Sequence, residues 1–191
     1  MIDEYLDYIH EGYIISNKTI MIDFDKFIKG GRLFIIGFSG SGKTGIAKAI
    51  EKKFRVKVCN LDSAWDRFGE PNVPTKAGDE WNDLQDDANK HMFEMIKDKR
   101  GCRVTEGIQL IFPPLISHIK PMLMKEACII MGKSALKSAV DATLRNKRKW
   151  NKPYIQSIRG ALKVNTKLYK RIENFRKERS RVSKTIKRFE I

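Results

Sequence analysis

Short apolar runs alternate with amphipathic segments through the middle of the chain. Four runs are mostly apolar and bounded by glycine or polar residues, which predicts buried β-strands: 32–36, 55–62, 101–107 and 127–131. Three longer segments repeat apolar residues at helical spacing: 45–53, 80–100 and 134–149. Alternation of strands and helices predicts an α/β fold with a doubly wound parallel sheet. Loops at the carboxyl ends of such strands line the ligand crevice.

The ends of the chain depart from this alternation. Residues 13–24 predict two strands around a polar turn, which gives an N-terminal extension with an edge hairpin over 1–30. The main domain is then expected over 31–191. Residues 108–114 lead into an irregular stretch before the fourth strand, and residues 153–188 predict one or two further helices.

A glycine-rich loop follows the first of the four strands. Residues 37–44 read Gly-Phe-Ser-Gly-Ser-Gly-Lys-Thr and fit the pattern G-x-x-x-x-G-K-[ST] between a strand and a helix. Glycines let backbone N–H groups turn towards a phosphate chain, and the helix start adds partial positive charge. The candidate phosphate-binding residues are Gly37, Ser39, Gly40, Ser41, Gly42, Lys43 and Thr44. Lys43 would reach the β- and γ-phosphates, and the Thr44 hydroxyl would hold Mg²⁺. The alternative is a glycine-rich turn that binds nothing.

On these residues the sequence resembles the P-loop NTPase superfamily. The resemblance implies a nucleoside triphosphate, usually ATP, together with Mg²⁺. It does not by itself distinguish a kinase from a motor or a switch.

Two carboxylates come at the ends of further strands. Asp62 closes the run 55–62, and Glu106 comes near the end of the run 101–107. Phosphoryl transfer to a hydroxyl needs a base near the incoming oxygen and carboxylates that hold Mg²⁺. Asp62 suits the first role and Glu106 the second. The alternative for each is that it caps the following helix.

The segment Leu61-Asp62-Ser63-Ala64-Trp65-Asp66-Arg67 resembles the acceptor region of small P-loop kinases, such as adenylylsulfate kinases and nucleoside kinases. The resemblance covers roughly residues 32–150. It implies that Asp62 is the catalytic base and that Arg67 contacts the acceptor, although Arg67 would equally suit a surface pair with Asp66. The chain has no typical Walker B run and no N-K-x-D motif, which argues against motors and GTPase switches.

Arginines follow the fourth predicted strand. Small kinases carry a mobile lid there, whose arginines neutralise the charge of the transferring group. Arg145 and Arg148 are three residues apart on the helix predicted at 134–149, so they share a face. The resemblance implies that both are catalytic lid residues. The alternative is a solvated basic helix end, which the helix dipole favours by itself.

The net charge of +15 lies entirely in the last third of the chain. Residues 133–191 hold 19 Lys and Arg against 4 Asp and Glu, whereas residues 1–132 hold 19 of each kind. Such an excess indicates a polyanionic partner, and nucleic acid is the natural candidate. Some phage-encoded P-loop kinases phosphorylate hydroxyls on DNA, which would use both a kinase site and a basic tract. The alternative is that the basic tract serves as the lid and phosphate clamp of a nucleotide kinase.

We therefore predict a kinase that transfers the γ-phosphoryl group of ATP to a hydroxyl of a nucleic acid or nucleotide. The alternatives are a kinase for a free nucleoside, nucleoside monophosphate or other small metabolite, and a nucleic-acid-binding ATPase. The distant Cys59, Cys102 and Cys128 favour buried, reduced thiols, which suits a cytoplasmic protein, of the host cell if viral. No run reaches the roughly 18 apolar residues of a membrane span.

Overall fold

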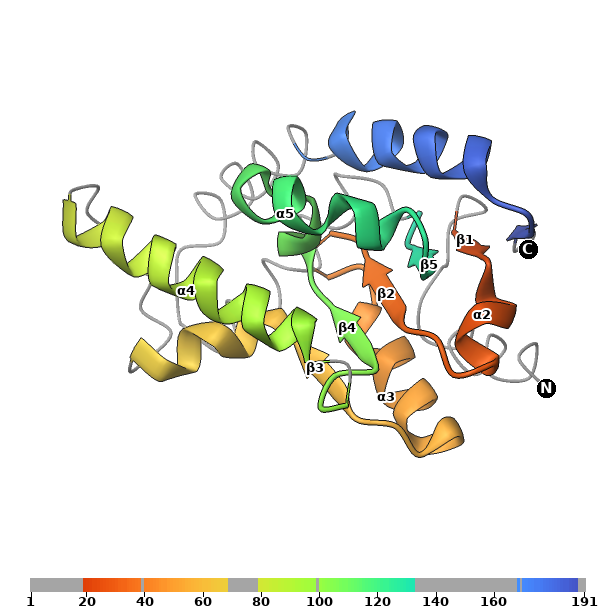
Figure 1. The fold of residues 1–191 in the computed structure, drawn as a ribbon, viewed down its shortest axis with the longest axis horizontal. Helices are drawn as coiled ribbons and strands as arrows, with labels where there is room; N and C mark the ends of the chain where they lie inside the picture. The colour runs from red at the N-terminus through yellow and green to blue at the C-terminus, as the bar shows by residue number, and fades with distance from the viewer. Residues whose placement is uncertain are drawn as a thin grey trace.

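The sheet is mixed and contains the predicted parallel strands at its centre. The computed structural model describes residues 19–38, 40–68, 79–98, 100–132, 168 and 170–188. Their strands are β1 (Ile20–Ile22), β2 (Leu33–Ile36), β3 (Val58–Asn60), β4 (Val104–Glu106), β5 (Ala127–Ile130) and β6 (Ile186–Arg188). They form one sheet in the order β3-β4-β2-β5-β1-β6 (Figure 1). β3, β4, β2 and β5 are parallel, which confirms the expected α/β class, whereas β1 and β6 are antiparallel additions.

Helices cover both faces of this sheet. The α-helices are α2 (Phe24–Ile28), α3 (Lys43–Phe54), α4 (Asp79–Lys97), α5 (Pro113–Leu123) and a C-terminal helix over 170–182. Two 3₁₀-helices, η1 (Leu61–Phe68) and η2 (Ile108–Ile111), follow β3 and β4 directly. Figure 1 shows α2 and α3 on one side of the sheet, and α5 and the C-terminal helix on the other.

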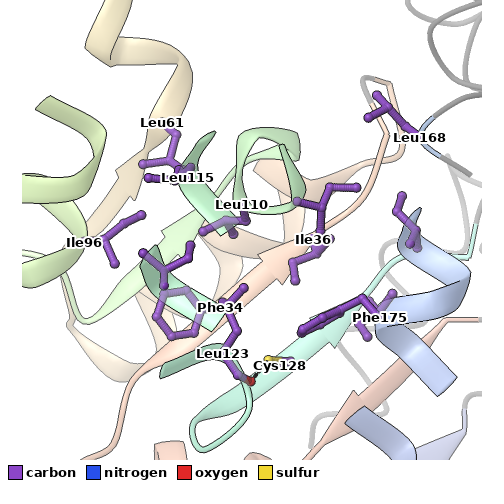
Figure 2. Packing of buried hydrophobic residues seen from close by; sticks show 14 of the residues in the cluster. Phe34, Ile36, Leu61, Ile96, Leu110, Leu115, Leu123, Cys128, Leu168 and Phe175 are labelled. Atoms are coloured by element: carbon purple, nitrogen blue, oxygen red, sulfur yellow. Dashed lines mark hydrogen bonds between the residues drawn. The ribbon is translucent and has the colours of Figure 1, made fainter. Parts of the chain in front are cut away.

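Alternation along the strands divides the core into two parts. In β2, Phe34 and Ile36 pack with α4, α5 and the C-terminal helix, and Figure 2 shows this cluster around them. Leu33 and Ile35 point to the opposite face and pack with α2 and α3. All four side chains are fully buried because a central parallel strand is covered on both faces. The glycine-rich loop therefore follows the most enclosed strand of the sheet.

The expected N-terminal edge hairpin is wrong in one respect. Its first strand lies outside the described residues, but its second strand corresponds to β1, which pairs with β5 on one side and β6 on the other. β1 is therefore not an edge strand. Residues 20–28 also contribute buried side chains to the same core as β2.

Two other elements differ from the sequence prediction. Residues 113–123 form α5, where we expected an irregular stretch between residue 114 and the fourth strand. Pro113 and Pro114 start this helix, and proline is tolerated in the first turn because those N–H groups have no intrahelical partner. The predicted helices of 153–188 end earlier than expected, since the described helix stops at residue 182 and β6 follows it.

A buried arginine fastens this C-terminal segment to the start of the chain. Arg179 is 0% exposed, and its guanidinium donates to the Asp23 carboxylate at 2.9 Å and to the carbonyl oxygens of Leu123 and Glu126. Asp23 also accepts from the backbone N–H groups of Lys184 and Thr185, just before β6. At least one residue of the basic third is therefore structural rather than available to a polyanion.

The expectation of three reduced thiols is also wrong. Cys59 in β3 and Cys102 before β4 form a disulfide, with Cα atoms 5.5 Å apart. β3 pairs with β4, and the turn that leads into β4 brings Cys102 beside Cys59; the separation is typical of a disulfide. Cys128 is free and buried, and burial raises the pKa of its thiol to about 12. The argument for a reducing compartment therefore loses its support.

Disulfide reduction should destabilise the fold measurably. The bond closes a loop with a sequence separation of 43 residues. Such a cross-link contributes about 2–4 kcal/mol, so reductant should lower the free energy of unfolding by that amount in urea titrations. The Cys59→Ala/Cys102→Ala variant should be insensitive to reductant. Alkylation of the denatured, unreduced chain should modify Cys128 alone, and modification of all three cysteines would contradict the disulfide.

Candidate functional site

The glycine-rich loop wraps in front of the first turn of α3. Gly40 and Gly42 have φ angles of 75° and 90°, which residues with a Cβ rarely adopt, so the loop needs glycine at both positions. The backbone N–H of Ser41 donates to the Phe38 carbonyl at 3.1 Å, and α3 begins at Lys43. The first N–H groups of a helix have no partner within it. They lie here directly behind the loop.

The interior of this loop is closely packed and polar. A Cβ on Gly37 would lie 2.6 Å from Met131 Cβ and 2.7 Å from Ser41 Oγ, so only glycine fits there. Ser41 is buried, and within the described residues its hydroxyl has no hydrogen-bond partner. The Lys43 ammonium donates to the Phe38 carbonyl at 2.8 Å. Phosphate oxygens would supply acceptors for both groups, so these residues fit an anionic ligand.

A hydroxyl and a carboxylate meet at the base of the loop. Glu106 is the last residue of β4 and lies opposite Ile35 of β2, so its side chain reaches the start of α3. The Thr44 hydroxyl donates to Glu106 Oε2 at 3.2 Å. Glu106 is only 2% exposed. This pair of oxygen-bearing groups is what a hard cation such as Mg²⁺ prefers.

Burial raises the pKa of the Glu106 carboxyl above its ordinary value, and the negative charge of Asp62 raises it further. The hydrogen bond from Thr44 and the positive charges of Lys43 and Lys48 act in the opposite direction. A cation bound beside such a buried carboxyl would lower its pKa, because the cation stabilises the charged form. Lys43, Asp62 and Glu106 therefore act on one another within one small region.

Asp62 lies beside this region, just after the parallel strand β3. It is the second residue of η1 rather than the last residue of β3, and its side chain is exposed. Its backbone N–H donates to the Asn60 side chain at 2.8 Å, which fixes the turn after the strand. The Gln109 amide donates to Asp62 Oδ1 at 2.5 Å.

Gln109 is the residue that the sequence interpretation missed. It belongs to η2, two residues after Gly107, and it is buried. One signal could have identified it, because it is the single polar side chain in the apolar run Ile108-Gln109-Leu110-Ile111-Phe112. Buried polar side chains in such runs need a partner, and here the partner is Asp62.

The structure brings some of the predicted residues together and leaves the others undescribed. Gly37, Gly40, Ser41, Gly42, Lys43, Thr44 and Glu106 surround the loop, with Asp62 close enough to affect the Glu106 carboxyl. Ser39, Arg145 and Arg148 lie outside the described residues, and the side chain of Arg67 is also outside them. The lid helix predicted at 134–149 is outside them too.

The chain is thus an α/β protein with a polar site at the carboxyl ends of its parallel strands. No family model matches it, and no curated protein matches it. Within the described parts of the chain, no helix is both long and apolar enough to span a membrane. The same residues contain no group of three or more His, Cys, Asp and Glu side chains that could hold a metal ion.

Proposed function

We propose that this chain is an ATP-dependent kinase of the P-loop type, which transfers the γ-phosphoryl group to a hydroxyl of a nucleic acid or nucleotide. The contact between Thr44 and Glu106 carries the proposal. It joins the end of a glycine-rich loop to a buried carboxylate on the neighbouring strand, where Mg²⁺ would lie in a phosphoryl-transfer site.

The topology of the sheet supports this assignment. Helix α3 connects β2 to β3, which lies on the far side of β4. Helix α4 then leads from β3 to β4, next to β2, and α5 leads from β4 to β5 on the other side of β2. The connections thus run in opposite directions on the two sides of β2. In open α/β sheets, ligands bind at such a switch point, outside the carboxyl ends of the strands. The glycine-rich loop lies at that end of β2.

Each residue then has a role consistent with its contacts. The loop backbone and Lys43 would hold the phosphates, while Thr44 and Glu106 would hold Mg²⁺. Bound Mg²⁺ would neutralise charge on the phosphate oxygens, and it needs few protein ligands because phosphates and water complete its shell. Asp62 would accept the proton of the attacking hydroxyl. Arg145 and Arg148 stay predicted lid residues, and Arg67 a predicted acceptor contact.

The basic third supports a nucleic acid or nucleotide as the acceptor. The charge excess of residues 133–191 is large even after Arg179, which is buried against Asp23, is set aside. Phosphate contacts of this kind weaken steeply with salt.

Transfer from γ-labelled ATP to a panel of acceptors tests the proposal. The panel is DNA, RNA, DNA with hydroxymethylated bases, free nucleosides and nucleoside monophosphates. Label in a polymer, with a steep dependence of binding on salt, is the expected result. Label only in small molecules would show a small-molecule kinase. Nucleic-acid-stimulated hydrolysis with no labelled product would show an ATPase and would reject the kinase proposal.

Asp62→Asn should separate catalysis from nucleotide binding. Removing a general base costs about 10²–10⁴-fold, so kcat should fall by that factor. ATP binding should be nearly unchanged, because the loop backbone and Lys43 would hold the phosphates, whereas the Asp62 carboxylate accepts a hydrogen bond from Gln109. Isothermal titration with ATP and steady-state kinetics measure the two effects. Asp86→Asn on α4 is a control for the loss of an exposed carboxylate to which we assign no role. Transfer at the wild-type rate in Asp62→Asn would contradict the base assignment.

A further inference from the structure

Gln109 lies in a position that only a small neighbour permits. A Cβ on Gly107 would lie 2.6 Å from Gln109 Oε1 and 2.9 Å from Leu61 Cβ. Because residue 107 is glycine, the Gln109 side chain of η2 has room to reach Asp62 in η1. The chain therefore brings the residue after β4 and the residue after β3 into direct contact.

The orientation of this amide is fixed by its partner. A carboxylate only accepts hydrogen bonds, so the nitrogen of Gln109 must face Asp62 Oδ1 and the oxygen must face away. That oxygen is buried, and within the described residues it has no hydrogen-bond partner. A buried acceptor without a donor costs free energy, so packing and turn geometry alone give no reason for an amide here. An apolar side chain of similar size would avoid the cost.

What the amide does is hold Asp62. Asp62 is exposed, and a carboxylate held by no partner exchanges between several rotamers. We infer that Gln109 is a positioning residue: it fixes Asp62 Oδ1 so that Oδ2 faces the acceptor hydroxyl. This inference rests on the proposed kinase function and assigns a further residue to it.

The step that Gln109 assists is a balanced in-line displacement. The acceptor oxygen attacks the γ-phosphorus, and its proton passes to Asp62 Oδ2. The bond from the γ-phosphorus to the bridging oxygen breaks, and ADP leaves with that electron pair. If the carboxylate is not oriented before the reaction, ordering it adds an entropic cost to the barrier; a carboxylate that is already held by Gln109 avoids this cost.

A double-mutant cycle distinguishes positioning from a general structural role. Gln109→Met keeps the length and apolar packing but removes the donor. We expect kcat to fall about 10–100-fold while Kd for ATP stays within about twofold of wild type. In the Asp62→Asn background, the same substitution should lower kcat by less than about twofold, because its effect passes through the carboxylate. The assay uses γ-labelled ATP and the panel acceptor that the wild-type chain labels fastest.

The controls separate loss of positioning from misfolding and from failure of the proposed kinase function. Asn89→Leu removes another amide whose nitrogen is buried without a described partner, on α4, and should leave kcat unchanged. Thermal melts check that each variant is folded, and Gln109→Leu replaces Gln109→Met if the latter is not. Equal losses from Gln109→Met in both backgrounds, or an unchanged kcat, would overturn the inference. If transfer by Asp62→Asn is too slow to measure, the Gln109→Met variant alone is compared with wild type. A lower kcat with an unchanged Kd for ATP then supports the inference, and an unchanged kcat overturns it. Absence of transfer by the wild-type chain would instead reject the proposed function.

Discussion

Lys43→Ala is expected to abolish phosphoryl transfer. The ammonium already lies in the loop, 2.8 Å from the Phe38 carbonyl, and it would exchange this acceptor for the β- and γ-phosphates. Loss of one donor aimed at the developing charge costs about 10²–10³-fold in kcat, and loss of a full positive charge at this place costs at least as much. Steady-state transfer from γ-labelled ATP measures the effect.

Lys52→Ala is the matched control for this substitution. Lys52 is exposed in the last turn of the same helix, far from the loop, so its loss should leave kcat unchanged. Because Lys43 also bonds its own loop, thermal melts of both variants are needed to separate catalysis from folding. Lys43→Ala with kcat within about tenfold of wild type would contradict the phosphate role, since a clamping charge contributes more than that.

The glycine-rich loop and the parallel centre of the fold could be predicted because their signals are local. The pattern from Gly37 to Thr44 fixes a strand, a turn with positive φ angles and a helix start within a few residues. The apolar run 127–131 likewise predicted β5 correctly, apart from its last residue. Glu106 was expected at the carboxyl end of a strand, and it is the last residue of β4.

The errors concern pairing between distant residues. β1 and β6 are three residues long, and Ile20 pairs with Arg188 far along the chain. So short a strand has little periodicity, and its partner is fixed only by tertiary packing. The Cys59–Cys102 bond likewise depends on the register of β3 beside β4, which spacing alone does not reveal. The contact between Gln109 and Asp62 has the same origin, because it joins two turns that the sheet brings together.

The charge excess of residues 133–191 includes arginines that stabilise the fold as well as charges that could bind a polyanion. In the sequence, every Lys and Arg of residues 133–191 counts equally towards a polyanion site. In the structure, Arg176 pairs with Glu173 and Arg179 is fully buried with Asp23. Arginine suits such a buried site because its planar group bonds several oxygens at once. Composition therefore overstates the charge available for binding.

Loss of Arg179 from its buried ion pair with Asp23 should lower the stability of the fold. Arg179→Met removes the guanidinium and leaves the buried Asp23 carboxylate with Lys26 as its remaining cationic partner, at 2.7 Å. Breaking a buried pair costs about 3–5 kcal/mol when the remaining charge is uncompensated, and the loss here should lie towards the lower end of that range because Lys26 still pairs with Asp23. Arg181→Met, an exposed change on the same helix, should alter stability by less than about 0.5 kcal/mol. Urea unfolding curves of the two variants give the comparison.

Acid titration tests the same pair independently. Burial alone would raise the pKa of Asp23, but hydrogen bonds from Lys26, Arg179 and Thr185 outweigh it and lower the pKa from 3.8 to about 2. A lowered pKa stabilises the fold above pH 3.8, and this contribution is lost as the pH falls towards 2. Wild-type protein should lose about 2 kcal/mol over this range through Asp23, and Arg179→Met should lose less. Identical acid slopes in the two proteins, with equal stability at neutral pH, would show that the pair does not hold β6 and the C-terminal helix to the sheet.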